Sequence, residues 1–176
     1  TVESWSYVNG SWRRGDLAFA ESRWFDLTGS PNGELEALAE RFHLHPLAVE
    51  DCLSPLLHAP KVDEFPDYLF VILQAVIGDE HATMEEIDLF VGRDLFITFH
   101  ERPVPEIAAV FDLLAENRPI RAGMDGLLYE VADRLVDGIL PEVDRIADEL
   151  ERMHDAILDR PGKPSNAHGV AALRSE

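Results

Sequence analysis

Apolar residues in the middle of the chain form runs that are typical of strands. The run Tyr68 to Ile77 is almost wholly apolar and rich in β-branched and aromatic residues, which predicts a strand covered on both faces of a sheet. Two further runs, residues 87–91 and 95–99, are joined by the turn-forming Gly92-Arg93-Asp94 and predict an antiparallel hairpin. The sheet is therefore expected to be at least partly antiparallel.

The first 28 residues have weaker strand signals. Residues 4–8 lead into Asn9-Gly10, a dipeptide that is typical of two-residue hairpin turns, and residues 17–20 and 24–27 add two short apolar runs. We expect three short strands in this part of the chain.

Helical spacing of apolar residues predicts three helices around these strands. The first covers residues 30–42, with Ser30 as its N-cap and Pro31 in its first turn. A short helix opens at His45-Pro46 and ends near Leu53, and a third begins at Pro103 or Pro105 and runs to about Asn117, where it should cover one face of the sheet.

The longest periodic segment follows Gly123 and predicts a helix of roughly 35 residues, with a kink or break near Gly138 because Pro141 lacks a backbone N–H. We therefore divide the chain into a sandwich domain (1–122), a long acid-rich helix packing on it (123–160), and a linker with the start of another helix (161–176). The sequence begins at Thr1 without Met and ends as that last helical pattern begins, so we expect it to be a fragment of a longer protein.

The charge of the chain is strongly negative. Fifteen basic and 34 acidic residues give a formal net charge of −19 at pH 7, which disfavours nucleic acid and anionic lipid as partners. Such a surface attracts cations, although solubility alone would also explain it. Cys52 is the only cysteine, which excludes an intramolecular disulfide and a cysteine-rich zinc site. No segment has the roughly 20 consecutive apolar residues of a membrane-spanning helix, so the fragment itself is expected to be soluble.

Glu50 and Asp51 are the first candidate functional residues. They lie in the first turns of the short helix, where the exposed backbone amides and the helix dipole favour negative charge without any ligand. A hard cation such as Mg²⁺ takes only one or two carboxylates and keeps several waters, so the pair would also suffice for half a metal site. Both interpretations stay open at this point.

Other patterns are less specific. Asp133 and Asp137 share one face of the long helix, which predicts either a solvated face or a cation-screened face packed on another helix. His43 and His45 lie near Glu50 and Asp51 and allow a zinc hypothesis, but His45 before Pro46 is also well placed to cap the helix. Phosphate-binding loops, a Gly-x-Ser-x-Gly elbow and a nucleophile motif around Cys52 are all missing, so we expect no enzyme.

Six features occur in a characteristic order along the chain: segments 24–27, 42–51, 60–63 and 127–129, Asp133, and segment 136–137. In this order the sequence resembles, from about Trp24 to Arg160, the cytoplasmic N-terminal part of one known family, the CorA-type divalent-cation transporters. The resemblance implies an α/β (α+β) fold, a three-layer αβα sandwich with a mixed, partly antiparallel sheet followed by a long acidic helix. The family's transmembrane pore and its Gly-Met-Asn signature lie outside this sequence.

The resemblance also implies a function. In the family, five cytoplasmic domains form a funnel at the inner membrane, and Mg²⁺ bound between neighbouring subunits holds the gate shut. The matching positions are Asp51 for the principal intersubunit site and Glu50 with Asp133 for a second site, each completed by a neighbour's stalk helix. The expected ligand is regulatory Mg²⁺, weakly held by the isolated domain, with Co²⁺ or Zn²⁺ as further candidates. A zinc-transporting member and a soluble acidic interaction module remain the alternatives.

Overall fold

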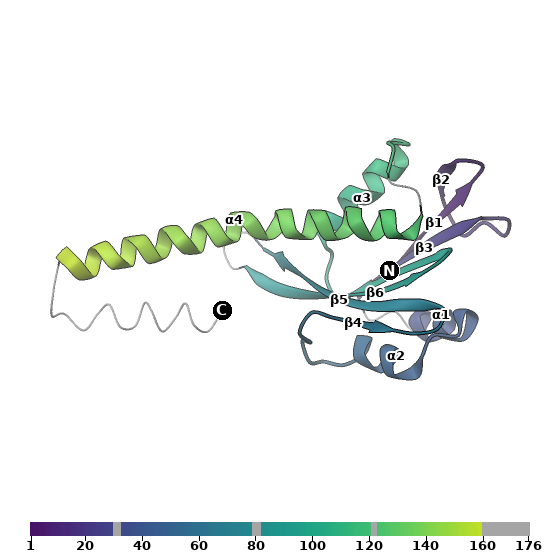
Figure 1. Ribbon diagram of the computed structural model, residues 1–176, viewed down its shortest axis with the longest axis horizontal. Coiled ribbons are helices and arrows are strands. Elements are labelled where there is room, and N and C mark those ends of the chain that lie inside the picture. Colours follow the sequence, from purple (N-terminus) through teal and green to yellow (C-terminus); the bar gives the residue numbers. More distant parts are fainter. Residues whose placement is uncertain (30–32, 79–81, 121–122, 160–176) are drawn as a thin grey trace.

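The computed structural model describes residues 1–29, 33–78, 82–120 and 123–159. Seven strands and four helices follow one another along these segments (Figure 1). The strands are β1 (Val2–Val8), β2 (Ser11–Arg14), β3 (Ser22–Thr28), β4 (Lys61–Glu64), β5 (Tyr68–Ile77), β6 (Thr83–Gly92) and β7 (Leu95–His100). The helices are α1 (Glu34–Phe42), α2 (Pro46–Cys52), α3 (Pro105–Ala115) and α4 (Met124–Asp159).

All seven strands belong to one sheet, in the order β2-β1-β3-β7-β6-β5-β4. Only β3 and β7 pair in parallel, with Trp24 opposite Phe96, and every other neighbouring pair is antiparallel. The sheet is therefore mixed and mostly antiparallel, as predicted.

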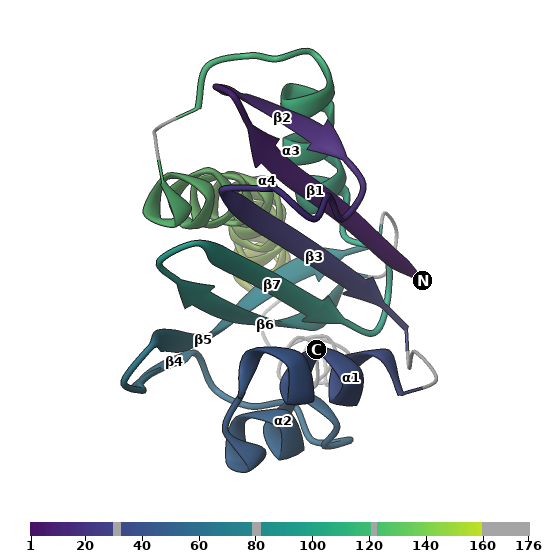
Figure 2. The ribbon, with the colours of Figure 1, turned by 90° about the vertical axis from the view of Figure 1, so that its right-hand side faces the viewer.

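Helices cover both faces of this sheet, which confirms the three-layer αβα sandwich (Figure 2). One core packs α3 and α4 on the sheet through Ile107, Val110, Leu127 and Val131. The other packs α1 and α2 on the opposite face through Leu35, Leu38, Ala48 and Cys52, together with strand residues. Burying apolar surface on both sides is what makes the sheet strands so apolar.

Strand β5 shows this two-sided burial most clearly. Phe70 and Ile72 point into the core under α1 and α2, whereas Val71 and Ala75 point into the core under α3 and α4. The observed bounds are those predicted from the sequence.

The N-terminal hairpin differs from the prediction. Asn9 and Gly10 do form the turn, both with positive φ, but the strand that returns from it is Ser11–Arg14 and not residues 17–20. Phe19 is 72% exposed and lies in no strand. A two-residue turn pairs the residues directly beside it, so proximity to Asn9-Gly10 outweighed the apolar content of residues 17–20.

Helix α1 begins at Glu34, and the predicted start at Ser30 and Pro31 lies outside the described residues. Its predicted apolar face is correct: Leu35 and Leu38 are buried, and Ala39 and Phe42 pack against them.

Helix α4 continues through Pro141 without interruption, so of the predicted kink or break near Gly138 the break is wrong, and the kink stays a prediction (Figure 1). Pro141 leaves the carbonyl of Asp137 without its usual N–H partner, but both residues are exposed, and water can take the place of the lost donor. Met124, Leu127, Val131 and Leu135 anchor the first part of the helix in the core. Beyond them the apolar positions are half exposed, as at Leu140 (54%).

The division at residues 122 and 160 stays a prediction, and the proposed linker and helix in 161–176 lie outside the described residues. Within the part of the chain that the structure describes, no helix combines the length and apolar content needed to cross a membrane.

Candidate functional site

Helix α2 presents Glu50 and Asp51 away from the core. Ala48 and Cys52 are buried and hold one side of the helix against the sheet. Glu50 and Asp51 therefore lie toward solvent. The helix starts as predicted: Pro46 occupies its first turn, and Nδ1 of His45 accepts a hydrogen bond from the Leu47 N–H at 3.2 Å. Local sequence therefore sets where these carboxylates stand.

Asp51 has a counter-ion from its own chain. Lys61, the first residue of β4, donates from Nζ to Asp51 Oδ2 at 2.8 Å and lies 2.8 Å from Asp63 Oδ2. All three side chains are partly exposed, with 29% of the Asp51 side chain and 38% of that of Lys61 open to solvent. The ion pair is therefore accessible to competing ions.

A hollow of about 660 Å³ opens beside this ion pair. Glu50 and Asp51 line it together with Pro46, Ser54 and His58. Carboxylate, hydroxyl and imidazole groups facing one hollow suit a hydrated cation, because water molecules can bridge the ion to several of them.

Two acidic residues of β6 lie beneath α2. Glu86 accepts hydrogen bonds from the backbone N–H of His58 and, at 2.9 Å, pairs with His58 Nδ1. This hydrogen bond raises the pKa of His58 above its ordinary value. Glu86 thus ties the loop after α2 to the sheet.

Asp88 is the most deeply buried carboxylate of this group, at 2% exposure. Its Oδ1 has no hydrogen-bond partner among the described residues, and the Cys52 thiol hydrogen-bonds to its carboxyl group. Burial first, and then the negative charge of Glu86, raise the pKa of Asp88 from 3.8 to about 7. Burial also raises the pKa of Cys52, so the thiol stays protonated and unreactive.

Asp133 does not join Glu50 and Asp51 within one chain. It is exposed on α4, which covers the face of the sheet opposite to α2. Among the residues that the structure describes, no group of three or more His, Cys, Asp or Glu side chains has an arrangement that could hold a metal ion.

The histidines of the zinc hypothesis serve the ends of helices. His43 ends α1 in the left-handed conformation, with φ of 55°, and His45 caps α2. His45 uses ring atom Nδ1 for this cap, whereas His43 takes part through its backbone.

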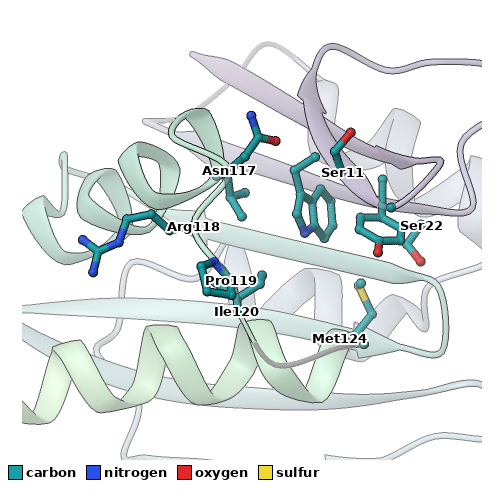
Figure 3. Close-up of a pocket in the computed structure, with 12 residues that line it drawn as sticks. Ser11, Ser22, Asn117, Arg118, Pro119, Ile120 and Met124 are labelled. Carbon is teal, nitrogen blue, oxygen red and sulfur yellow. The ribbon is translucent and has the colours of Figure 1, made fainter.

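A second hollow, of about 620 Å³, lies between the β1–β2 hairpin and the segment that joins α3 to α4 (Figure 3). None of the twelve residues that line it is acidic, and Arg118 is among them. It therefore lacks the anionic oxygen ligands that a hard cation requires.

The sequence correctly predicts that Glu50 and Asp51 lie on a short helix. It assigns no role in the site to Lys61, His58, Glu86 or Asp88. A signal was available for Asp88, because a lone acid inside the apolar run 87–91 is expected to be buried and therefore perturbed. The pairing of Lys61 with Asp51 had no comparable signal, since it depends on the path of the loop between them.

The arrangement of this sheet and its helices is that of the soluble domains of CorA transporters. The soluble domain of CorA from Methanocaldococcus jannaschii superposes with a TM-score of 0.74 at 19% identity, covering 99% of this chain and 70% of that one. The cytoplasmic domain of ZntB from Vibrio parahaemolyticus superposes with a TM-score of 0.75 at 18% identity over 98% of this chain and 70% of that one.

The sequence itself matches the family described as CorA-like Mg²⁺ transporter protein over residues 19–176, and the chain belongs to this family. A putative metal ion transporter, YfjQ of Bacillus subtilis, is 35% identical over 141 residues, which are 80% of this chain and 43% of that protein. The cobalt/magnesium transport protein CorA of Thermotoga maritima is 29% identical over 150 residues, 80% of this chain and 41% of that protein. The chain thus spans about two fifths of the length of these relatives, and the family is one of transporters, not of enzymes.

Proposed function

We propose that this chain is the cation-sensing, gating domain of a CorA-like divalent-cation transport channel, with Mg²⁺ as the regulatory ion. It acts at the cytoplasmic face of the membrane through binding, not catalysis. The observation that supports this most is the position of Asp51: a partly exposed carboxylate that lines a hollow with Glu50 and that, among the described residues, belongs to no set of three or more ligands able to hold a metal ion. Such a half-site fits a cation bound between two copies.

The charge of the chain supports a role for cations in assembly. Five copies, as in the family's pentamer, would bring together a formal charge of 5 × −19, or −95. A divalent ion between carboxylates of neighbouring subunits would offset this repulsion, and its loss would favour separation. In this proposal the ion binds the arrangement with neighbouring subunits together more tightly than the arrangement with subunits apart. A gating ligand requires such a difference in affinity.

The acidic face of α4 offers a place for the second site. Asp133 and Asp137 are exposed there. In this proposal Glu50 and Asp133 of different subunits contribute to a second site near the first, and a neighbour's stalk helix supplies the remaining carboxylate. Zinc is less favoured, because Nδ1 of His45 already accepts the hydrogen bond that caps α2.

Substituting Asp51→Asn in the full-length protein tests the principal site. We expect the Mg²⁺ concentration that gives half-maximal protection from proteolysis to rise by about tenfold, because a neutral amide replaces one anionic ligand; this corresponds to about 1.4 kcal/mol. Chymotrypsin is the suitable protease, and the titration is read on gels.

The matched control is Asp112→Asn. Asp112 is an exposed acid on α3, on the opposite face of the sheet, so this variant has the same change in net charge. It should leave the midpoint within twofold of the unchanged protein. An unchanged midpoint in Asp51→Asn would overturn the proposed site.

A further inference from the structure

Lys61 connects three elements around the proposed site. It lies on the edge strand β4 opposite Ile72 of β5, and its Nζ stands between Asp51 of α2 and Asp63 of its own strand. The ammonium also lies 5.7 Å from the centre of the Phe70 ring. A single positive charge thus occupies the coordination space of Asp51 Oδ2.

We propose that Lys61 is a built-in counter-cation of Asp51 that an incoming divalent cation must displace, so that Lys61 sets the concentration at which the site fills. This inference rests on the proposed function of Asp51. It adds a regulatory residue on the same chain to a site otherwise defined by its acidic ligands.

Displacement is favoured over simultaneous binding for two reasons. The ammonium already uses Asp51 Oδ2 at 2.8 Å, one of the two carboxylate oxygens that a metal or its water shell would contact. A divalent ion bound beside it would also stand within a few ångströms of a like charge. The lysine therefore has to leave before the carboxylate can serve the metal fully.

Asp63 gives the displaced ammonium a second partner. Lys61 contacts Asp63 at the same distance as Asp51, and its flexible stem carries three N–H donors. Leaving Asp51 therefore breaks one ion pair and keeps the other. The exchange needs only a side-chain rotation on the surface.

Lys61 is positively charged while it is paired with Asp51. Hydrogen bonds to Asp51 and then to Asp63 raise the pKa of Lys61 above its ordinary value. Deprotonation thus does not release Asp51 near neutral pH, and competition by another cation does. A doubly charged ion competes better than a monovalent one, because its attraction to the carboxylates is about twice as large.

The test is Lys61→Gln in the full-length protein, titrated with MgCl₂ and probed with chymotrypsin, which does not cleave at lysine. We expect the midpoint for Mg²⁺ protection to fall by about threefold to tenfold, since both the competing ion pair and a repelling charge are removed. Lys61→Arg, which keeps the charge and the ion pair, should leave the midpoint unchanged or higher. An unchanged or higher midpoint in Lys61→Gln would overturn the inference.

A double-mutant cycle separates competition at Asp51 from a general change in charge. In the Asp51→Asn background the ion pair between residues 51 and 61 is already lost and only the pair of Lys61 with Asp63 remains, so Lys61→Gln should lower the midpoint by less than twofold. An undiminished effect there would overturn direct competition. If Asp51→Asn alone has no effect, the proposed function fails; if Asp51→Asn raises the midpoint and Lys61→Gln does not lower it, only the role of Lys61 fails.

Discussion

Replacing Asp88 by Asn is expected to make the protein progressively more stable, relative to the unchanged chain, as the pH rises from 4 to 8. Asp88 is buried, and its pKa is raised from 3.8 to about 7. At a pH between these two pKa values, the Asp88 carboxyl group is ionised in the unfolded chain and protonated in the folded protein. The stabilisation due to protonated Asp88 is therefore complete below the unfolded pKa and is lost as the pH rises through the folded pKa.

The size of this effect follows from the pKa difference. One pKa unit corresponds to about 1.4 kcal/mol, so the free energy of unfolding of Asp88→Asn should gain on that of the unchanged protein by up to about 4 kcal/mol across this range. Urea unfolding at pH 4, 6 and 8 measures the difference at each pH. Any pH-independent cost of the buried amide shifts all three values equally and leaves the trend intact.

The groups that face Asp88 are the same in both proteins, namely Glu86 on the same strand, His58, and Cys52 and Asp51 on α2. Because both chains keep them, the comparison isolates the contribution of the Asp88 carboxyl group. The exposed-acid variant Asp112→Asn serves as the control and should show no such trend. A difference between Asp88→Asn and the unchanged protein that is the same at all three pH values would contradict the prediction.

Trp24→Ala is expected to lower the free energy of unfolding by about 3–5 kcal/mol. Trp24 is fully buried on β3, where its ring packs edge-on against Phe96 at 5.5 Å and lies 4.4 Å from the Phe111 ring. Truncation would leave a cavity between the sheet and α3 that these rings cannot fill. Denaturant unfolding at one pH measures the loss.

Trp24→Phe distinguishes the contribution of ring packing from that of the indole hydrogen bond. The indole N–H donates to Thr98 Oγ1 at 2.9 Å, and the Thr98 hydroxyl in turn donates to Asp26. Phenylalanine keeps much of the ring packing and removes that donor, so a smaller loss of about 1–3 kcal/mol is expected. Equal losses in the two variants would show that packing against Phe96 and Phe111 matters less than the contacts imply.

The apolar pattern was sufficient to predict the strands buried on both faces, but not those at the edges of the sheet. Tyr68–Ile77 was predicted with its observed bounds because every position contacts a core or a neighbouring strand. Lys61–Glu64 was missed as a strand, because it is short and polar and its extended form depends on pairing with β5. Thr83 to Glu86 were missed for the same reason: they extend β6 only through their pairing with residues 74–77.

The candidate site also has features that local sequence predicts and features that it does not. Glu50 and Asp51 follow from a local rule, a proline-started helix with one apolar side, and the structure places them on that helix. The ion pair between Asp51 and Lys61 depends on how separate segments pack, which no local pattern encodes. The burial of Asp88 has a local signal in the apolar run 87–91, but its contact with Cys52 again depends on packing. The roles of Glu50, Asp51 and Asp133 in binding a cation stay predictions.

The uneven anchoring of α4 has a mechanical consequence. Its first third is held in the core by residues up to Leu135, while the remainder extends about 36 Å beyond that point at 1.5 Å per residue. The helix is unbroken at Pro141, so a rigid tilt of α4 would have its pivot at the sandwich. A rotation of about 5° at the pivot would move the far end by about 3 Å, so a small repacking of the sandwich becomes a much larger displacement at the tip.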